Sequence, residues 1–208
     1  MNARCVGVLA LQGAFSAHVE TLVELGVSCR EVRTPEDLAQ VDALVIPGGE
    51  SSTISQLLES SGLLEPLRAR LGGGMPAFGT CAGMILLAAR IVDGRDDQIS
   101  LSVLDIVVRR NAFGRQVDSF EAEIDTVVGP FHGVFIRAPR IETTGPGVEV
   151  LGRLGDEPVL VREGRVLAAS FHPELSGDAR LHRLFLQRAG FDGFESAEAP
   201  MAHMRRES

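Results

Sequence analysis

The first ninety residues alternate short apolar runs with longer segments of helical periodicity. Residues 5–11, 27–32 and 43–46 are apolar runs of strand length, and residues 76–78 form a fourth. Residues 15–25, in contrast, carry apolar side chains at the spacing of one helix face. Strands that alternate with helices indicate a parallel sheet covered on both faces, because each crossover connection lays a helix on the sheet. We therefore expect an α/β protein, a three-layer α/β/α sandwich.

The second half of the chain contains further strand candidates. They lie at residues 101–108, 120–124, 133–136, 148–151, 159–161 and 166–170, and a final helix is expected at 178–188. The Glu163-Gly164 step indicates a hairpin turn, so the sheet is predicted to be mixed although mostly parallel. A length of 208 residues fits one domain, predicted at residues 1–190. Residues 191–208 lose the apolar periodicity and are expected to be a flexible tail.

Composition excludes several classes of function. All 20 basic residues are arginine and the net charge is -8, which argues against a nucleic-acid partner. Without lysine the chain cannot form a Schiff base with a carbonyl compound. Three widely spaced cysteines predict neither a metal site nor a disulfide framework. No apolar run approaches the roughly 18 residues of a membrane span, so we expect a cytoplasmic protein with no membrane partner.

One cysteine lies between two glycines where the fourth strand candidate meets an apolar helix, which is expected at residues 81–90. Residues 79–83, GTCAG, fit the G-x-C-x-G pattern of a nucleophile elbow, a sharp turn between a strand and a helix. The N-terminus of that helix favours a thiolate on Cys81. An isolated cysteine in apolar surroundings more often only fills space. The strand, turn and helix in register favour the nucleophile.

A base and a group to orient it follow the last strand candidate. His172 and Glu174 are two residues apart, and Pro173 disfavours a helix at His172. Both side chains can therefore face one cleft, where Glu174 orients the imidazole and His172 accepts the thiol proton. His18 and His182 lie in expected helices, where a packing or solvated role is more common.

Two glycines follow the third strand candidate. The carboxyl ends of parallel strands share one edge of the sheet, so Gly48 and Gly49 are expected near Cys81. The backbone N–H groups of Gly49 and Ala82 are then candidates for an oxyanion hole. An ordinary turn is the alternative, which two glycines alone do not exclude.

Two arginines end strand candidates in the second half. Arg110 and Arg137 each carry a guanidinium that suits a substrate carboxylate. Surface arginines are common in a chain without lysine, so spacing alone favours a solvated role for both.

Together these motifs resemble the class I, or triad, glutamine amidotransferases, and among them the glutaminase subunits of pyridoxal phosphate synthase. The segments that carry the resemblance are VLALQG, PGGESS, FGTCAG, RRNAFGRQVDSFEAE, GVFIRAP and SFHPEL. They extend from the first strand to the last helix. One departure is Met84, because many general amidotransferases carry glutamine after the elbow glycine.

The resemblance implies a class I amidotransferase-like, flavodoxin-like fold with a Cys81–His172–Glu174 triad. This triad would hydrolyse L-glutamine to L-glutamate and ammonia through a thioester on Cys81. The glutamine contacts that it implies are Gly48, Gly49, Glu50, Arg110, Ile136 and Arg137. The ammonia would pass to a separate synthase subunit that makes pyridoxal 5'-phosphate (vitamin B6), and this chain would hold no cofactor. Gln12, at the end of the first strand, is expected to help sense that partner.

Two other functions stay open from the sequence. One is a stand-alone cysteine hydrolase of gamma-glutamyl or other amide bonds that uses the same triad. The other is a non-catalytic relative that senses a metabolite or redox state through Cys81. The presence of both His172 and Glu174 argues against the sensor, which needs neither a base nor its orienting group.

Overall fold

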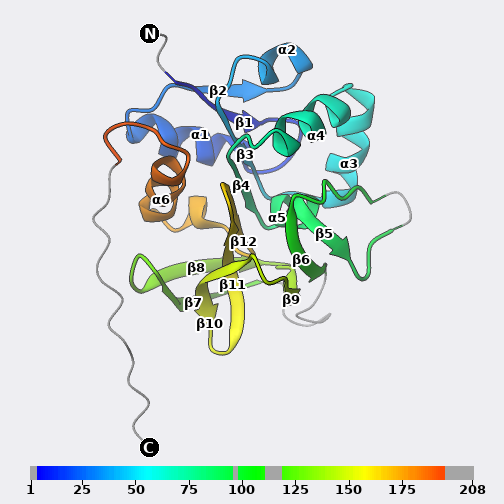
Figure 1. Cartoon of the computed structure of the whole chain (residues 1–208). Helices are drawn as coiled ribbons and strands as arrows, with labels where there is room; N and C mark the ends of the chain where they lie inside the picture. The colour runs from blue at the N-terminus through cyan, green and yellow to red at the C-terminus, as the bar shows by residue number, and fades with distance from the viewer. Residues whose placement is uncertain (1–3, 96–97, 111–118, 195–208) are drawn as a thin grey trace, which may run out of the picture.

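The computed structural model describes residues 4–95, 98–110 and 119–194 (Figure 1). Its main sheet contains β1 (Val6–Leu9), β2 (Cys29–Val32), β3 (Ala43–Ile46), β4 (Ala77–Thr80), β7 (Ser119–Thr126), β8 (Phe131–Ile136), β10 (Glu149–Leu154), β11 (Glu157–Glu163) and β12 (Val166–Ala169). Within the described ranges, these nine strands lie in the order β2-β1-β3-β4-β12-β11-β10-β7-β8. The first five run parallel, and each later strand is antiparallel to its neighbour. The predicted mixed sheet is confirmed.

Helices cover both faces of the parallel half. They are α1 (Phe15–Glu24), α2 (Pro35–Leu38), α3 (Ser51–Ser60), α4 (Leu64–Gly72), α5 (Ala82–Leu87) and α6 (Arg180–Arg188), with a short 3-10 helix η1 (Pro173–Leu175) after β12. Helices α1 and α6 lie on one side of the sheet, and α3, α4 and α5 lie on the other (Figure 1). This arrangement is the α/β/α sandwich expected from the sequence.

Each parallel strand contributes side chains to two separate hydrophobic cores. In β3, Leu44 and Ile46 pack with α3 and α4, whereas Ala43 and Val45 pack with α1 and α6. Successive side chains of a strand point to opposite faces, so a strand covered on both sides has to be apolar throughout. Burial of one such aliphatic side chain stabilises the fold by about 1.5–3 kcal/mol.

The helix predicted at residues 81–90 is wrong at its C-terminal end. Helix α5 ends at Leu87, and Ala88 has the extended angles φ -60° and ψ 147°. The chain continues as β5 (Ala88–Ile91) in a small second sheet with β6 (Leu104–Arg109) and β9 (Arg140–Thr144). The helical preference of the two alanines in β5 is a weak local effect. Pairing of β5 with β6 overrides this preference.

The boundary of the expected tail also needs correction. Phe191 is buried, and Phe194 packs against the same core as α6. The packed part of the chain therefore extends beyond Gly190 to residue 194, and residues 195–208 lie outside the described residues. In the described ranges, no helix is long and apolar enough to cross a bilayer.

Candidate active site

Cys81 occupies a strained turn between β4 and α5. Its φ of 50° is positive, a conformation that side chains other than glycine rarely adopt. The two flanking glycines are required by close packing, because a Cβ atom on Gly83 would lie 2.0 Å from the carbonyl oxygen of Ile46. A Cβ atom on Gly79 would lie 2.7 Å from the backbone of Gly83. The local structure is thus the elbow that the sequence predicted.

His172 and Glu174 lie beside this turn, after β12. The strands β4 and β12 are parallel neighbours, so both segments emerge at the same edge of the sheet. The N–H of His172 donates to the carbonyl of Val134 in β8 at 2.8 Å. Its Nδ1 lies 2.7 Å from Oε1 of Glu174. The backbone and the ring of His172 are therefore both fixed.

The electrostatics of His172 favour its charged form. Burial alone would lower the pKa of His172, but hydrogen bonds to Cys81 and Glu174 and the charges of these partners raise the pKa to about 10. Burial likewise opposes ionisation of Glu174, yet the hydrogen bond from His172 and the nearby histidines lower the pKa of this carboxyl. An imidazolium held in this way favours a thiolate on the neighbouring sulfur.

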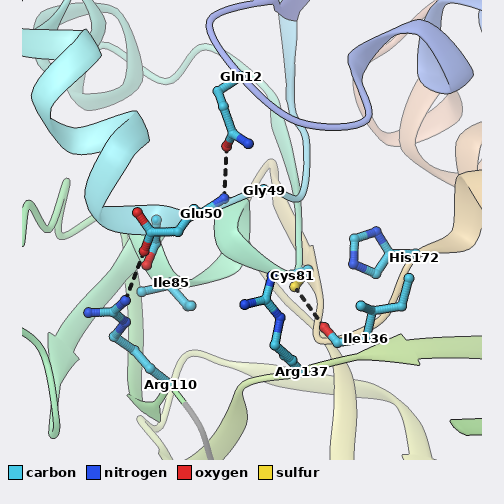
Figure 2. A pocket seen from close by; sticks show the side chains of 10 residues that line it. Gln12, Gly49, Glu50, Cys81, Ile85, Arg110, Ile136, Arg137 and His172 are labelled. Atoms are coloured by element: carbon cyan, nitrogen blue, oxygen red, sulfur yellow. Dashed lines mark hydrogen bonds and ion pairs between the residues drawn. The ribbon is translucent and has the colours of Figure 1, made fainter. Parts of the chain in front are cut away.

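A cavity of about 330 Å³ opens in front of Cys81 (Figure 2). Its lining consists of Gln12, Gly49, Glu50, Ser51, Cys81, Ile85, Arg110, Ile136, Arg137 and His172. The volume suits a ligand with the size of an amino acid. Most of the site residues predicted from the sequence therefore line one cavity.

Three predicted site residues lie outside this lining. Glu174 is buried behind His172, as an orienting group should be. Gly48 lies against the imidazole, because a Cβ atom there would come within 2.3 Å of Cε1 of His172. Ala82 is the first residue of α5, where backbone N–H groups have no partner within the helix.

The far wall of the cavity contains an ion pair. Nη2 of Arg110 lies 3.1 Å from Oε1 of Glu50. Glu50 also caps α3, since its carboxylate accepts hydrogen bonds from the N–H groups of Ser52 and Thr53. Burial would raise the pKa of Glu50, but the bonds from Thr53 and Ser52 and the charge of Arg110 lower it. Glu50 is thus an anion at neutral pH.

Two segments from the antiparallel half complete the cavity. The carbonyl oxygen of Ile136, at the end of β8, lies 3.8 Å from Sγ of Cys81 (Figure 2). The next residue, Arg137, has a positive φ of 43°. A backbone conformation this rare for a side-chain-bearing residue is typical of functional sites.

Ser51 and Ile85 line the cavity, although neither was predicted as a site residue. Ile85 follows Cys81 by four residues on α5, so helical periodicity was a usable signal for it. Ser51 begins α3 directly after Glu50. Gln12 was expected at the active-site edge, where it would help sense a partner; it lines the cavity, and its Oε1 accepts a 2.8 Å hydrogen bond from the N–H of Glu50.

The comparison with family models gives a match over residues 8–190, to the SNO glutamine amidotransferase family. The chain belongs to the SNO glutamine amidotransferase family. The matched range begins in β1 and ends just after α6, so it includes both halves of the sheet and the whole cavity lining. The resemblance noted from the sequence motifs is confirmed.

Individual relatives agree with this assignment to the SNO family. The chain is 58% identical over 190 residues to the pyridoxal 5'-phosphate synthase subunit PdxT of Parafrankia sp. (strain EAN1pec), covering 90% of this chain and 94% of the relative. It is also 58% identical over 187 residues to the subunit of the same name from Thermus thermophilus, covering 89% and 97%. A crystal structure of a glutamine amidotransferase superposes with a TM-score of 0.84 at 56% identity, covering 89% of this chain and 98% of that one.

A more distant structure supports only the fold of this SNO family member. A glutamine amidotransferase from Thermotoga maritima has a TM-score of 0.56 at 14% identity, over 90% of this chain and 80% of that chain. At such low identity the shared feature is the arrangement of sheet and helices.

Proposed function

We propose that this member of the SNO family hydrolyses L-glutamine to L-glutamate and ammonia, and that the ammonia passes to a synthase subunit that makes pyridoxal 5'-phosphate. The observation that carries the proposal is the position of Cys81 on a strained elbow, beside the His172–Glu174 pair and at the wall of an amino-acid-sized cavity. The names of the relatives, which are pyridoxal 5'-phosphate synthase subunits, support the destination of the ammonia.

The reaction begins with attack of the Cys81 thiolate on the side-chain carbonyl carbon of glutamine. The carbonyl oxygen becomes an oxyanion, and the N–H groups of Gly49 and Ala82 are the proposed donors that stabilise it. The imidazolium of His172 gives its proton to the departing amide nitrogen, so the C–N bond breaks and ammonia leaves. The product of this step is a glutamyl thioester on Cys81.

Water completes the cycle. The neutral His172 now removes a proton from a water molecule, which attacks the thioester carbon. The second tetrahedral intermediate collapses with loss of the thiolate, and glutamate is released. Glu174 keeps Nδ1 of His172 protonated throughout, so that only Nε2 exchanges protons with the substrate.

Recognition of glutamine fits the ion pair on the cavity wall. The substrate carries one carboxylate and one ammonium group besides its amide. Arg110 and Arg137 suit the carboxylate, whereas Glu50 suits the ammonium group. The bound amino acid would then replace the direct contact between Glu50 and Arg110 with two new ion pairs. Gly48 and Ile136 are proposed to shape the site through their backbones.

The proposal includes a separate partner and a simple domain plan. The glutaminase domain, predicted at residues 1–190, would include the packed residues 191–194, and a synthase subunit would receive the ammonia in a hetero-oligomer. Gln12 follows β1 and contacts the loop that holds Gly49. It is therefore the residue proposed to link this loop to the partner. The cytoplasmic location stays a prediction from the sequence.

The test is glutamate release from glutamine, measured for the wild type and for Cys81→Ala, each with the synthase present or absent. We expect activity that rises with the synthase and disappears in Cys81→Ala. Full activity in Cys81→Ala would overturn the proposed nucleophile. High activity that does not respond to the synthase would favour the stand-alone hydrolase instead.

A further inference from the structure

Two histidines that play no part in the proposed reaction are buried directly behind Glu174. His18 comes from α1 and His182 from α6, and both side chains are fully buried. Nδ1 of His18 lies 2.9 Å from Nε2 of His182. Neither residue lines the cavity. Full burial of two adjacent imidazoles is costly unless their polar atoms find partners.

The carboxylate of Glu174 is asymmetrically bonded. Its Oε1 interacts with His172, whereas Oε2 is buried and has no partner of good hydrogen-bond geometry among the described residues. Nε2 of His18 lies 3.3 Å from Oε2. The same Nε2 lies 3.2 Å from Oγ1 of Thr80, the residue before Cys81. One nitrogen of His18 therefore faces both the triad acid and the elbow.

The contacts select one arrangement of protons. If Nε2 of His182 donates to Nδ1 of His18, then Nε2 of His18 carries a hydrogen and presents it to Glu174 and Thr80. Among the ring nitrogens of His18 and His182, Nδ1 of His182 alone then has no partner in the described structure. The opposite arrangement would point a lone pair of His18 at a carboxylate and bury an unpaired N–H on His182. The first arrangement costs less.

Both histidines are neutral in this arrangement. Burial lowers the pKa of His18, and it lowers the pKa of His182 to about 3. A metal ion is a poor alternative occupant, because the two facing nitrogens are already in hydrogen-bond contact. Among the described residues, no group of three histidine, cysteine or acidic side chains has the arrangement of a metal site.

We infer that His18 is a positioning residue for the triad: its Nε2–H holds Oε2 of Glu174, and His182 fixes the tautomer of His18 that makes this possible. The carboxylate is then restrained at both oxygens, and its orientation toward His172 does not depend on one bond. Thr80 shares the same N–H, so the restraint also joins the elbow to the acid. The expected effect on catalysis rests on the proposed glutaminase reaction, whereas the contacts of His18 do not depend on that reaction.

The test uses two substitutions at each histidine. His18→Gln places an amide N–H near the position of Nε2, whereas His18→Leu fills similar space without a donor. His182→Gln and His182→Leu make the same comparison at the residue that contacts His18. His132→Gln is the matched control, because His132 is exposed on β8 and pairs with Glu121.

Two readouts are needed. The first is kcat and KM for glutamine in the complex with the synthase. The second is the rate at which iodoacetamide alkylates Cys81 as a function of pH, which requires neither glutamine nor the synthase. The groups that titrate around His172 are Cys81 and Glu174, with His18 and His182 behind them; Glu50, Arg110 and Arg137 face the cavity side.

We expect His18→Leu to lower kcat by about tenfold, because the 3.3 Å contact of His18 with Oε2 lacks full hydrogen-bond geometry and is worth less than a charge-assisted hydrogen bond, with KM within threefold of wild type. The pH midpoint of alkylation should rise, since a poorly held Glu174 stabilises the imidazolium less. His18→Gln should restore kcat to within about threefold of wild type and return the pH midpoint toward the wild-type value, and His182→Leu should show the same defects in weaker form.

Wild-type kcat and alkylation profiles in folded His18→Leu would overturn the inference. Equal defects in His18→Leu and His18→Gln would also overturn it, since they would indicate packing alone. If His18→Leu does not fold, the Gln and Leu variants at His182 decide by the same criteria. A wild-type protein that alkylates normally but releases no glutamate would refute the proposed function and leave the alkylation test of His18 intact.

Discussion

Oε1 of Gln12 accepts a hydrogen bond of 2.8 Å from the backbone N–H of Glu50, so the segment after β1 holds the loop between β3 and α3. That loop carries Gly49, the proposed oxyanion donor. Gly49 also lies close to Gln12, because a Cβ atom on Gly49 would lie 2.3 Å from the same oxygen of Gln12. We therefore expect a movement of Gln12 to disturb the loop that carries the proposed oxyanion donor.

The first prediction concerns this link. We expect Gln12→Ala to reduce the stimulation of glutaminase activity by the synthase about tenfold, the value of one hydrogen bond. Alkylation of Cys81 in the free protein should stay unchanged. The control is Gln40→Ala, an exposed glutamine after α2. An unchanged response to the synthase in Gln12→Ala would remove Gln12 from the signal.

The second prediction concerns the glycine of the elbow. Gly83→Ala should lower the free energy of unfolding by about 3 kcal/mol or more, because the added methyl group cannot avoid the carbonyl of Ile46. Gly72→Ala is the matched control at the end of α4, where an added Cβ atom meets nothing within 4 Å. It should be neutral or stabilising by up to about 1 kcal/mol. Urea unfolding of both variants measures the difference, and equal stability would contradict the packing argument.

The third prediction concerns stability at low pH. His182 has a folded-state pKa of about 3, below its ordinary value of 6.5. The unfolded chain therefore binds a proton that the folded chain does not, and stability is lost as the pH falls from 6.5 toward 3. The contribution is about 1.4 kcal/mol per pH unit. His182→Asn removes this titration, so its stability between pH 6 and 4 should fall less steeply than that of the wild type. Parallel profiles in urea titrations would exclude a neutral buried His182.

His172 titrates in the opposite sense. Its pKa is raised to about 10, so its contribution to stability is complete below pH 6.5 and is lost as the pH rises toward 10. The two histidines together predict a stability maximum near neutral pH.

The fourth prediction concerns recognition of the substrate. Arg110→Ala should raise KM for glutamine by about 10- to 100-fold with a smaller effect on kcat, because an arginine fork to a carboxylate is a strong, charge-assisted contact. Arg109→Ala is the control, since Arg109 pairs with Glu142 and does not line the cavity. Equal KM values for the two variants would place the substrate carboxylate elsewhere.

The sequence predicted the parts of the site that depend on strand ends. Cys81, His172 and Gly49 each follow a parallel strand, and parallel strands bring their carboxyl ends to one edge whatever the intervening chain does. The sequence could not predict His18 and His182 as neighbours of Glu174. Helical periodicity indicates which face of a helix is buried, but it carries no information on which helix faces which residue across the sheet.

The missed elements have a similar cause. Helices α2 and α4 and strand β9 were not predicted, and β5 was assigned to a helix. The small sheet exists because β6 and β9, far apart in sequence, pair in antiparallel register. Local propensity is weak compared with such pairing, so short segments of this kind are decided by distant parts of the chain.

The insertion of β12 between β4 and β11 has a consequence for the order of folding. Residues 77–80 pair with residues 166–169, so the proposed nucleophile Cys81 and its proposed base His172 meet only through a contact of very high sequence separation. Contacts of this kind form late, because the chain between them has to close a long loop first. During synthesis, which proceeds from the N-terminus, the elbow cysteine leaves the ribosome well before its imidazole exists. Hydrolytic competence is therefore a property of the finished chain, and a nascent or truncated N-terminal half carries the thiol without the means to use it.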